Sequence, residues 1–543
     1  MRAPEMPRTP RLLTPTMGRR GFLTGTALLG ASIFLPRSAF AMATAVTPGV
    51  STTYGKVRGL IDEGVHAFKG LRYAAPPVGA LRFAPPRKPK PWQGTTEALG
   101  YGQPSMQLAS GGGAVSYPGT VGPALDQVFG FARDLQTQSE DCLFHNVWTP
   151  GLDDARRPVL VWFHGGGHNY GSGSWSAYDG HNLARDHDVV VVTVNHRLNA
   201  FGYLAAGDEP GESANVGELD LVAALEWVRD NIAEFGGDPG NVTLFGQSGG
   251  GSKVAHCLIM PAAKGLFHRA AIQSGGGLES GRVDAAVEVA DQVARELGCR
   301  AKDIDALRKV PARALLEAAI KVRGRFGPVA DGRIVPRDPF TPEAPEISKD
   351  VPLIIGYTKD ERTLYNIGLP WWGKLTTAEL EERAKELHGD KAEALLAAFR
   401  REHPTYSNDY LFTDLTNSHA YRAPTKAERK AAQGGAPVWL YQFDWEAPVD
   451  DRILRAPHTI EIPFVFNNVD KGPILLGTAE STQKLGAQVS AAWAAFARTG
   501  NPNTPMLPNW PAYDVENRAA MVFDTESRVV NDPMGEIRKI LQS

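Results

Sequence analysis

The stretch from Val242 to Gly250, Val-Thr-Leu-Phe-Gly-Gln-Ser-Gly-Gly, constrains this chain more than any other part of its sequence. Four strand-forming residues lead directly into Gly-x-Ser-x-Gly, and a helix-like segment follows, down to Pro261. This is the context of a nucleophile elbow, a sharp strand-to-helix turn that exposes a strained serine above a sheet. Gly246 and Gly250 would let the backbones approach closely there. We therefore predict a nucleophile at Ser248; the alternative is an ordinary serine in a small-residue turn, because the pattern also arises by chance.

Buried strands and helices alternate on both sides of this turn. Continuous apolar runs at 159–163 and 189–194 are typical of strands buried on both faces of a sheet. The segment 219–235 has helical periodicity. Further strands are expected at 55–59, 65–70, 352–356 and 438–443, and mostly helical sequence at 284–321 and 377–400. The alternation predicts the α/β class, with a large, mostly parallel central sheet, helices on both faces and helical insertions.

The connections between these segments also have distinctive compositions. Residues 102–138 are rich in Gly, Ser and Gln, and we expect a long loop there. The tripeptide 238–240, Asp-Pro-Gly, is expected to turn the chain into the strand before Ser248. With no internal repeat and no break in composition, residues 42–543 are expected to form a single domain.

Charge and cysteine usage exclude several classes of partner. The chain has 57 Lys and Arg against 60 Asp and Glu, without a long run of one sign, which argues against nucleic acid or an anionic membrane as the main partner. Its three cysteines are too few for a disulfide framework, and no Cys-x-x-Cys spacing suggests a metal site.

The first 41 residues are typical of a targeting segment. Residues 18–23 contain a twin-arginine pattern, an apolar stretch covers 27–35, and Ala39-Phe40-Ala41 is a small-x-small cleavage site. We predict a twin-arginine signal peptide over 1–41, export in a bacterium to the periplasm or outside, and no stable membrane anchor after its removal. A disordered or misassigned start is the alternative.

A second glycine-rich segment, His164-Gly165-Gly166-Gly167, directly follows the strand that ends at Phe163. Backbone N–H groups there could converge on one point, as an oxyanion hole requires. The N–H of Gly249, after the nucleophile, would be a third donor. A plain glycine turn is one alternative. A metal pair of His164 and His168 is the other, which three intervening glycines disfavour on a helix.

A serine hydroxyl needs a base, and the base needs an acidic partner. In this fold the chain order is serine, acid, histidine. Asp360 and Glu361 follow a buried strand, and spacing alone does not choose between them. His458 lies in a loop before an apolar segment and is the candidate base. His458 and Glu461 could also form a metal pair, but no third ligand is in view.

Four groups of residues resemble the signatures of one family. They are 68–77 with 81–83, 140–143 with 146–147, 231–239 with 245–248, and 510–511 with 521–524. On these motifs the chain resembles type-B carboxylesterases, the cholinesterase-like branch of the α/β-hydrolase fold, over about residues 50–525. In character it is most similar to the bacterial carboxylesterases.

The resemblance implies a role for each matching residue. It makes Ser248 the nucleophile, His458 the base and Glu361, rather than Asp360, the acid. The oxyanion donors that it implies are Gly166, Gly167 and Gly249. Ser274 resembles a serine of the family that supports the acid and the histidine; a buried hydroxyl bonded to backbone is the alternative.

The chain also departs from the family pattern. Many relatives carry glutamate where this chain has Gln247, and its loss weakens the electrostatic case for a cationic substrate. His145 and His168 stand where relatives usually have apolar residues, so we expect a more polar acyl pocket, lined by Gln247 and His168. Ser105 occupies the usual position of a disulfide partner, so Cys142 is expected to be a free thiol.

These features predict a serine hydrolase that cleaves small-molecule carboxylic esters through an acyl-enzyme, without a metal or organic cofactor. A hydrolase of related acyl bonds, such as amides, carbamates or thioesters, is the first alternative because the same triad serves all of them. A non-catalytic cholinesterase-like binding module is the second. The sequence does not define the physiological ester.

Overall fold

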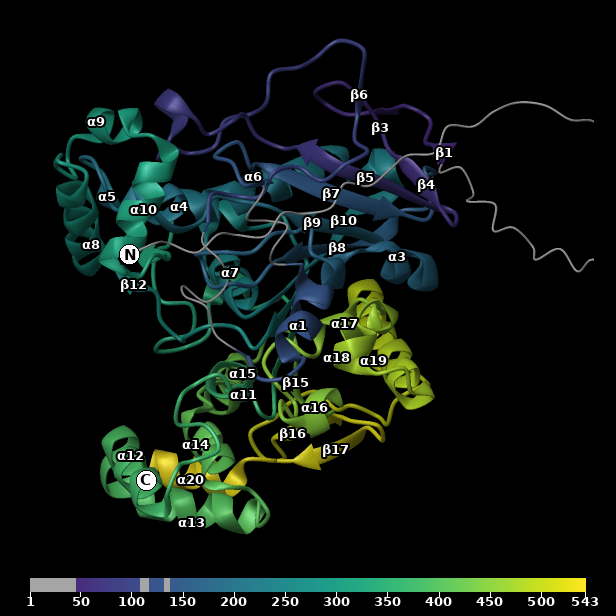
Figure 1. Cartoon of the computed structure of the whole chain (residues 1–543). Coiled ribbons are helices and arrows are strands. Elements are labelled where there is room, and N and C mark those ends of the chain that lie inside the picture. The colour runs from purple at the N-terminus through teal and green to yellow at the C-terminus, as the bar shows by residue number, and fades with distance from the viewer. Residues whose placement is uncertain (1–44, 108–116, 131–136) are drawn as a thin grey trace, which may run out of the picture. The chain divides into compact units, whose positions relative to one another are not determined.

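The computed structural model describes residues 45–107, 117–130 and 137–543 (Figure 1). The predicted signal peptide, 1–41, lies outside the described residues. The described part belongs to one compact unit, Thr44–Ser543.

A sheet of twelve strands, in the order β1-β4-β5-β7-β9-β8-β10-β11-β14-β15-β16-β17, carries the fold. Its strands are β1 (Ala45–Val46), β4 (Leu60–Asp62), β5 (Val65–Arg72), β7 (Phe144–Thr149), β8 (Arg157–Phe163), β9 (Val190–Val194), β10 (Gly237–Gln247), β11 (Arg269–Gln273), β14 (Leu353–Thr358), β15 (Val438–Phe443), β16 (Ala519–Phe523) and β17 (Arg528–Asn531). Neighbours from β9 to β16 pair in parallel. The strands beyond them pair antiparallel. The mostly parallel α/β sheet expected from the apolar runs is therefore present, with antiparallel margins.

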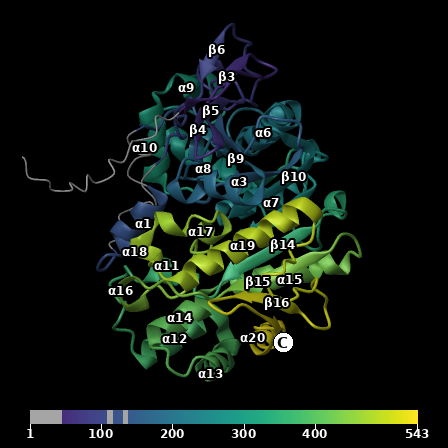
Figure 2. The same cartoon turned by 90° about the vertical axis from the view of Figure 1, so that its right-hand side faces the viewer.

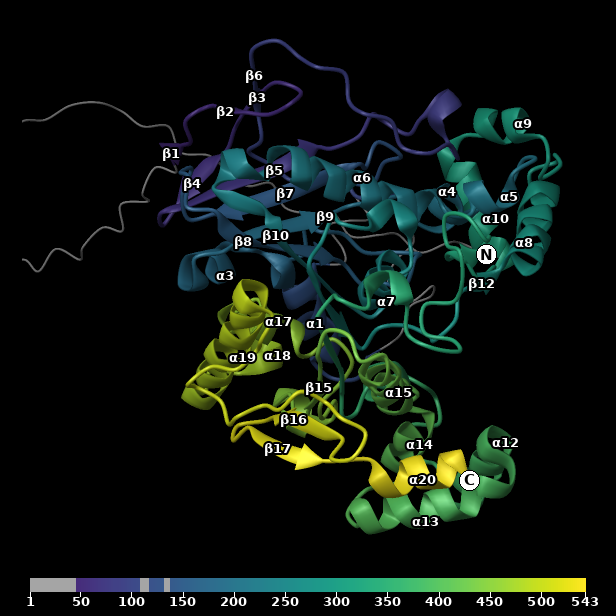
Figure 3. The ribbon, with the colours of Figure 1, turned by 180° about the vertical axis from the view of Figure 1, so that it is seen from behind.

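The two faces of the sheet are covered by different helices. One face packs against α6 (Val216–Asn231), α7 (Gly249–Cys257) and α15 (His419–Ala432) (Figure 3). The other packs against α1 (Val121–Phe129), α3 (His181–His187) and α19 (Glu480–Thr499), and Figure 2 shows α19 beside β14 and β15. Alternate residues of β8 face the two sides: Val159 and Val161 one, Leu160 and Trp162 the other. Burial on both faces explains the continuous apolar runs in the sequence.

Two further groups of helices have apolar clusters of their own. One group consists of α4 (Asn199–Tyr203), α8 (Val283–Glu296), α9 (Ile304–Lys309) and α10 (Ala312–Val322). The other consists of α12 (Thr377–His388), α13 (Ala392–Glu402), α14 (Asn408–Thr416) and α20 (Gly535–Gln542). These are the helical insertions expected at 284–321 and 377–400. No helix among the described residues is long and apolar enough to cross a membrane.

Two details of the sequence prediction were wrong. The long loop expected through 102–138 contains helix α1, whose residues Val121, Ala124, Leu125, Val128 and Phe129 are buried. That spacing puts them on one helical face, a signal hidden by the glycine-rich flanks. The tripeptide 238–240 does not precede β10 but lies inside it, where the pairing with β8 shifts between Gly237 and Val242.

Candidate active site

Ser248 stands at the turn between β10 and α7. Its backbone has φ 58° and ψ −121°, a strained conformation for a residue other than glycine. The strain is held because the Ser248 N–H donates to the Gln273 carbonyl at 2.8 Å. A Cβ on Gly250 would lie 1.9 Å from the Phe163 carbonyl oxygen, so the turn needs glycine there. The structure therefore contains a nucleophile elbow, with the serine side chain at its partly exposed tip.

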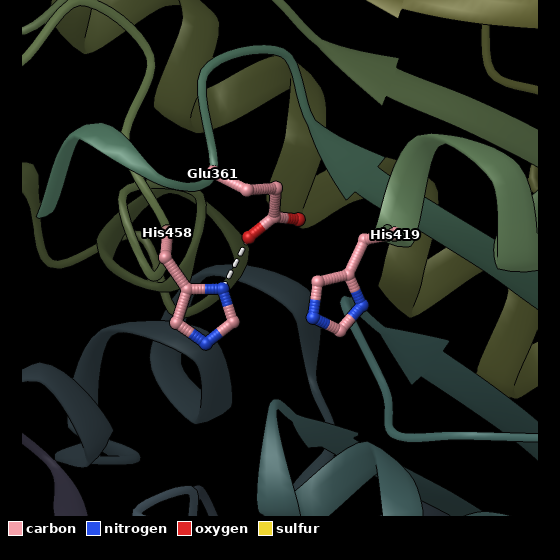
Figure 4. A group of neighbouring side chains, drawn as sticks. All are labelled: Glu361, His419 and His458. Carbon is pink, nitrogen blue, oxygen red and sulfur yellow. Dashed lines mark hydrogen bonds and ion pairs between the residues drawn. The ribbon is translucent and has the colours of Figure 1, made fainter. Parts of the chain in front are cut away.

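Glu361 and His458 form the pair beside this serine. The His458 Nδ1 and a Glu361 carboxylate oxygen are in direct, short contact, which Figure 4 shows. The other carboxylate oxygen accepts hydrogen bonds from the Ser274 hydroxyl at 2.6 Å and the Thr358 N–H at 2.9 Å. Burial by itself would raise the pKa of Glu361, but the neighbouring His458 and these hydrogen bonds outweigh it and lower the pKa to about 2. Glu361 is thus an ionised partner for the imidazole.

Asp360, which spacing alone could not separate from Glu361, has a different partner. Its N–H donates to the Ala456 carbonyl at 2.9 Å, and its carboxylate accepts from the Ala456 N–H at 3.2 Å. Ala456 lies two residues before His458, so Asp360 fixes the histidine loop while Glu361 contacts the ring. Burial raises the pKa of Asp360 to about 6, the opposite of its neighbour.

Gln247 lies under the imidazole and is fully buried. Its Nε2 is 3.3 Å from each nitrogen of the His458 ring, and its Oε1 has no partner among the described residues. With the His458 Nδ1–H directed at Glu361, Nε2 is the ring acceptor, and the Gln247 amide can donate to it. No hydrogen bond joins Ser248 Oγ to His458 within the described part of the chain. In the unliganded enzyme, such bonds are often formed only when substrate binds.

The glycine segment after β8 faces the start of α7. Gly166 and Gly167 have φ of 84° and 61°, which favour glycine. Across the residues that the structure describes, neither N–H donates to a protein acceptor. Gly249 is the first residue of α7, where N–H groups lack an intrahelical partner. A Cβ on Gly249 would lie 2.1 Å from the Gly167 carbonyl oxygen, so these two backbones touch. The three N–H groups are free donors on adjoining segments, as an oxyanion hole requires.

Other residues singled out in the sequence have surroundings of their own. His145 is buried on β7, stacked against Tyr73, and so belongs to the core rather than to an acyl pocket. His168 Nε2 lies 3.5 Å from a Glu218 carboxylate oxygen, and its ring contacts Tyr203; its place in a substrate pocket stays a prediction. Cys142, Cys257 and Cys299 are all free thiols, which confirms the expectation for Cys142.

The sequence left open a metal pair of His164 with His168 and another of His458 with Glu461. Neither pair occurs together in a group of three or more metal-binding side chains in the described ranges. The group with metal-binding residue types is Glu361, His419 and His458, whose ligand atoms lie within 4.8 Å of one another (Figure 4). Because Glu361 and His458 are already bonded to each other, the arrangement is an acid–base pair with a neighbouring imidazole. His419, stacked on His458 with ring centroids 5.7 Å apart, was not anticipated from the sequence.

The model of the carboxylesterase family matches residues 46–538. The chain is 38% identical to a para-nitrobenzyl esterase from Bacillus subtilis (strain 168) over 91% of this chain and 98% of that protein. It is 36% identical to a phenmedipham hydrolase from Pseudarthrobacter oxydans over 89% and 96%, respectively. The crystal structure of the Geobacillus stearothermophilus carboxylesterase EST55 superposes with a TM-score of 0.77 at 38% identity, covering 91% of this chain and 100% of the other.

Proposed function

The chain belongs to the carboxylesterase family of α/β-hydrolases and is a serine hydrolase of carboxylic esters; from this premise we propose that Ser248, His458 and Glu361 carry out the reaction. The observation that carries the proposal is the buried Glu361–His458 contact, fixed by Ser274 and in contact with Gln247, the residue before the strained Ser248. The three residues occur in the chain order that this fold uses.

Acylation begins when Ser248 Oγ replaces the Gln247 amide at His458 Nε2. His458 takes the serine proton as Oγ attacks the ester carbonyl carbon, and the carbonyl oxygen becomes the oxyanion of a tetrahedral intermediate. The free N–H groups of Gly166, Gly167 and Gly249 donate to that oxyanion. Collapse breaks the bond to the alcohol oxygen, which leaves with the proton that His458 returns.

Deacylation repeats these steps with water. His458 accepts a proton from the water as its oxygen attacks the acyl carbon, and then protonates Ser248 Oγ as the acid product leaves. Glu361 holds the ring with Nδ1–H toward the carboxylate and offsets the positive charge of the imidazolium in both halves.

Replacing the nucleophile is the direct test of this assignment. In Ser248→Ala, kcat for a para-nitrobenzyl ester should fall on the order of 10⁶-fold, because triad members act as a unit. An organophosphonate probe should label the wild type at Ser248 and leave the variant unlabelled. A folded Ser248→Ala protein with esterase activity near the wild type would overturn the proposal, and a wild type that never labels would favour a binding module.

We also propose that neutral esters are preferred to choline esters. A carboxylate next to the nucleophile would attract a quaternary ammonium, and here that position holds the uncharged Gln247. One relative bears the name para-nitrobenzyl esterase, which refers to esters of an uncharged alcohol. Acetylcholine and para-nitrobenzyl acetate share an acyl group, so the ratio of their kcat/KM values measures the preference between a cationic and a neutral alcohol group. A large preference for acetylcholine would contradict the proposal. The variant Gln247→Glu should shift the ratio of kcat/KM values a few-fold toward acetylcholine.

We propose, finally, that the protein is exported by the twin-arginine route. The support lies in the sequence of residues 1–41, with its paired Arg19 and Arg20. Cell fractionation of an Arg19→Lys/Arg20→Lys variant tests it. The variant should accumulate as the longer precursor inside the cell, whereas equal export of both proteins would refute the route.

A further inference from the structure

The segment that holds two of the proposed oxyanion donors, residues 164–171, is anchored by side chains from outside it. Asn199 Nδ2 donates to the Asn169 carbonyl at 3.3 Å, and the Asn199 N–H donates to the His168 carbonyl at 2.6 Å. Gln107 bonds Gly171 through both its amide oxygen and nitrogen. These anchors secure the far end of the segment.

The near end has a different anchor, Lys253. Its Nζ donates to the His164 carbonyl oxygen at 2.9 Å, two residues before Gly166. Lys253 belongs to α7, four residues after Gly249, which is the third proposed donor. Within the described residues, this is the side-chain hydrogen bond that links α7 to the glycine segment. It therefore connects the element carrying one donor with the element carrying the other two.

The burial of Lys253 calls for a physical reason. The side chain is fully buried. In the described part of the chain, no carboxylate oxygen lies within 4.0 Å of Nζ, the distance that defines an ion pair. Glu218 is the nearby carboxylate, but one of its oxygens accepts from the Tyr203 hydroxyl at 3.2 Å and the other has no partner among the described residues. Burying an ammonium without a paired charge is unfavourable. Glu218 favours the charged form of Lys253 at a distance, against the effect of burial, but the direct hydrogen bond of Nζ is to the His164 carbonyl.

The groups around Lys253 do not replace that contact. His164 and His196 stack with ring centroids 5.2 Å apart, and neither His164 Nε2 nor either nitrogen of His196 has a partner in the described residues. Burial lowers the pKa of both rings well below the usual range, so they are neutral. An amine donates a hydrogen bond whether or not it is protonated. The Lys253–His164 bond therefore persists in either charge state.

We propose that Lys253 is a positioning residue of the oxyanion hole, which holds the His164 carbonyl against α7 and so fixes Gly166 and Gly167 relative to Gly249. This inference rests on the proposed function, because it assumes that these glycines bind the oxyanion. The side-chain hydrogen bond of Lys253 is to the His164 carbonyl, and among the described residues none joins it to Ser248. Losing its bond should let the two sets of donors separate, which weakens binding of the transition state more than binding of the substrate.

Lys253→Met tests the proposal, because methionine fills similar space without a donor. We expect kcat for para-nitrobenzyl acetate to fall about 10- to 100-fold, which is at most the loss caused by removing one oxyanion donor. KM should stay within about threefold of the wild type. The inhibition constant of a trifluoromethyl ketone, which forms an oxyanion on Ser248, should rise in parallel with the loss of kcat/KM. The inhibition constant of the product acid, which forms no oxyanion on Ser248, should not change.

Stability separates positioning from a purely structural role. The substitution removes a buried amine that has no direct ion pair, but it also leaves the His164 carbonyl without its donor. The two effects oppose each other, so the unfolding temperature of Lys253→Met should stay within a few degrees of the wild type, on the order expected for about 1 kcal/mol. Lys430→Met is the matched control: Lys430 is also buried and donates to the backbone carbonyls of Ser348 and Lys349, away from the site. It should leave kcat unchanged. If Lys253→Met does not fold, Lys253→Gln carries the same test with a side chain too short to hold the bond.

The outcomes distinguish this proposal from the one on which it rests. A folded Lys253 variant with kcat within about twofold of the wild type, or with a raised KM and unchanged kcat, would overturn the positioning role alone, provided that Ser248→Ala is inactive. An active Ser248→Ala protein would instead overturn the triad itself. A parallel loss of kcat in Lys430→Met would show that the effect is a general consequence of removing a buried lysine.

Discussion

The two sides of Ser248 are built in different ways. On the acid–base side, Glu361 has a partner for each carboxylate oxygen: His458 on one, Ser274 and Thr358 on the other. On the oxyanion side, the donors are backbone N–H groups on two segments. Buried polar atoms of the neighbouring His164 and His196 have no hydrogen-bond partner among the residues that the structure describes. The first side is fixed by side chains that bond one another directly. The second depends on how closely a loop and a helix approach.

This difference indicates how each side should respond to substitution. A network of paired, charged hydrogen bonds is sensitive to the loss of any one member. A hole made of backbone groups has no side chain to remove, so it is altered only through its packing and anchors. The two sides are therefore expected to lose activity in different ways when residues are replaced.

The largest effect is expected at the acid. Glu361→Gln keeps the shape of the side chain but presents an amide to His458, which removes the charge that offsets the imidazolium and the acceptor that fixes the ring tautomer. We expect kcat to fall about 10⁴-fold with little change in KM. Steady-state kinetics measures this, with Asp360→Asn as the comparison on the neighbouring carboxylate. A larger loss of kcat in Asp360→Asn than in Glu361→Gln would reverse the assignment.

The next effect is expected on the oxyanion side. In Gly249→Ala, the new Cβ would lie 2.1 Å from the Gly167 carbonyl oxygen, so the glycine segment must move. We expect kcat to fall about tenfold or more, in step with weaker binding of a trifluoromethyl ketone. If ketone binding is unchanged, the contact between these two backbones does not define the oxyanion hole. The oxyanion side would then not depend on how closely the loop and the helix approach.

A smaller effect is expected from the support of the acid. Ser274→Ala removes the 2.6 Å hydrogen bond to Glu361 but leaves the Thr358 N–H in place. A hydrogen bond to a charged group contributes about 1.5–3 kcal/mol, part of which the remaining donor retains, so kcat should fall roughly 5- to 30-fold. A Ser274→Thr variant, which keeps a hydroxyl, should recover much of the activity. Equal losses in both variants would point to packing instead.

The effect of the acid on stability is measured separately from kcat and is lost only at low pH. Because the pKa of Glu361 is about 2 in the folded protein, below its ordinary value near 4.5, its ionised form stabilises the fold above pH 4.5. That contribution, on the order of 3 kcal/mol, is lost as the pH falls from about 4.5 to 2. The free energies of unfolding of wild type and Glu361→Gln should therefore differ at pH 7 and converge near pH 2. A constant difference across this range would show that Glu361 is not held ionised by its partners.

The acid–base side could be predicted from the sequence to a large extent. The elbow motif located Ser248, and the order of the chain restricted the acid to two neighbouring carboxylates. Spacing could not choose between Asp360 and Glu361, because the choice depends on which side chain turns toward the histidine loop's backbone and which toward its ring. The family resemblance supplied that choice.

The oxyanion side could be predicted only in outline. The glycines were visible, but nothing local marks Lys253, because a lysine inside a helix usually faces solvent. Its burial depends on the packing of α7 against the segment after β8, which distant parts of the chain determine. The same reason applies to α1, whose helical face is recognisable only once it is seen to be buried. The short antiparallel strands at the sheet margins likewise lack a strong sequence pattern.

The free state of Cys142, Cys257 and Cys299 has a consequence for where the protein can fold. These are all the cysteines of the chain, so no covalent cross-link has to form after synthesis. The native structure is accessible in a reducing compartment, without an oxidant or an isomerase. The proposed export of an already folded protein would need that independence, and a reductant added to the folded protein would find no disulfide to break.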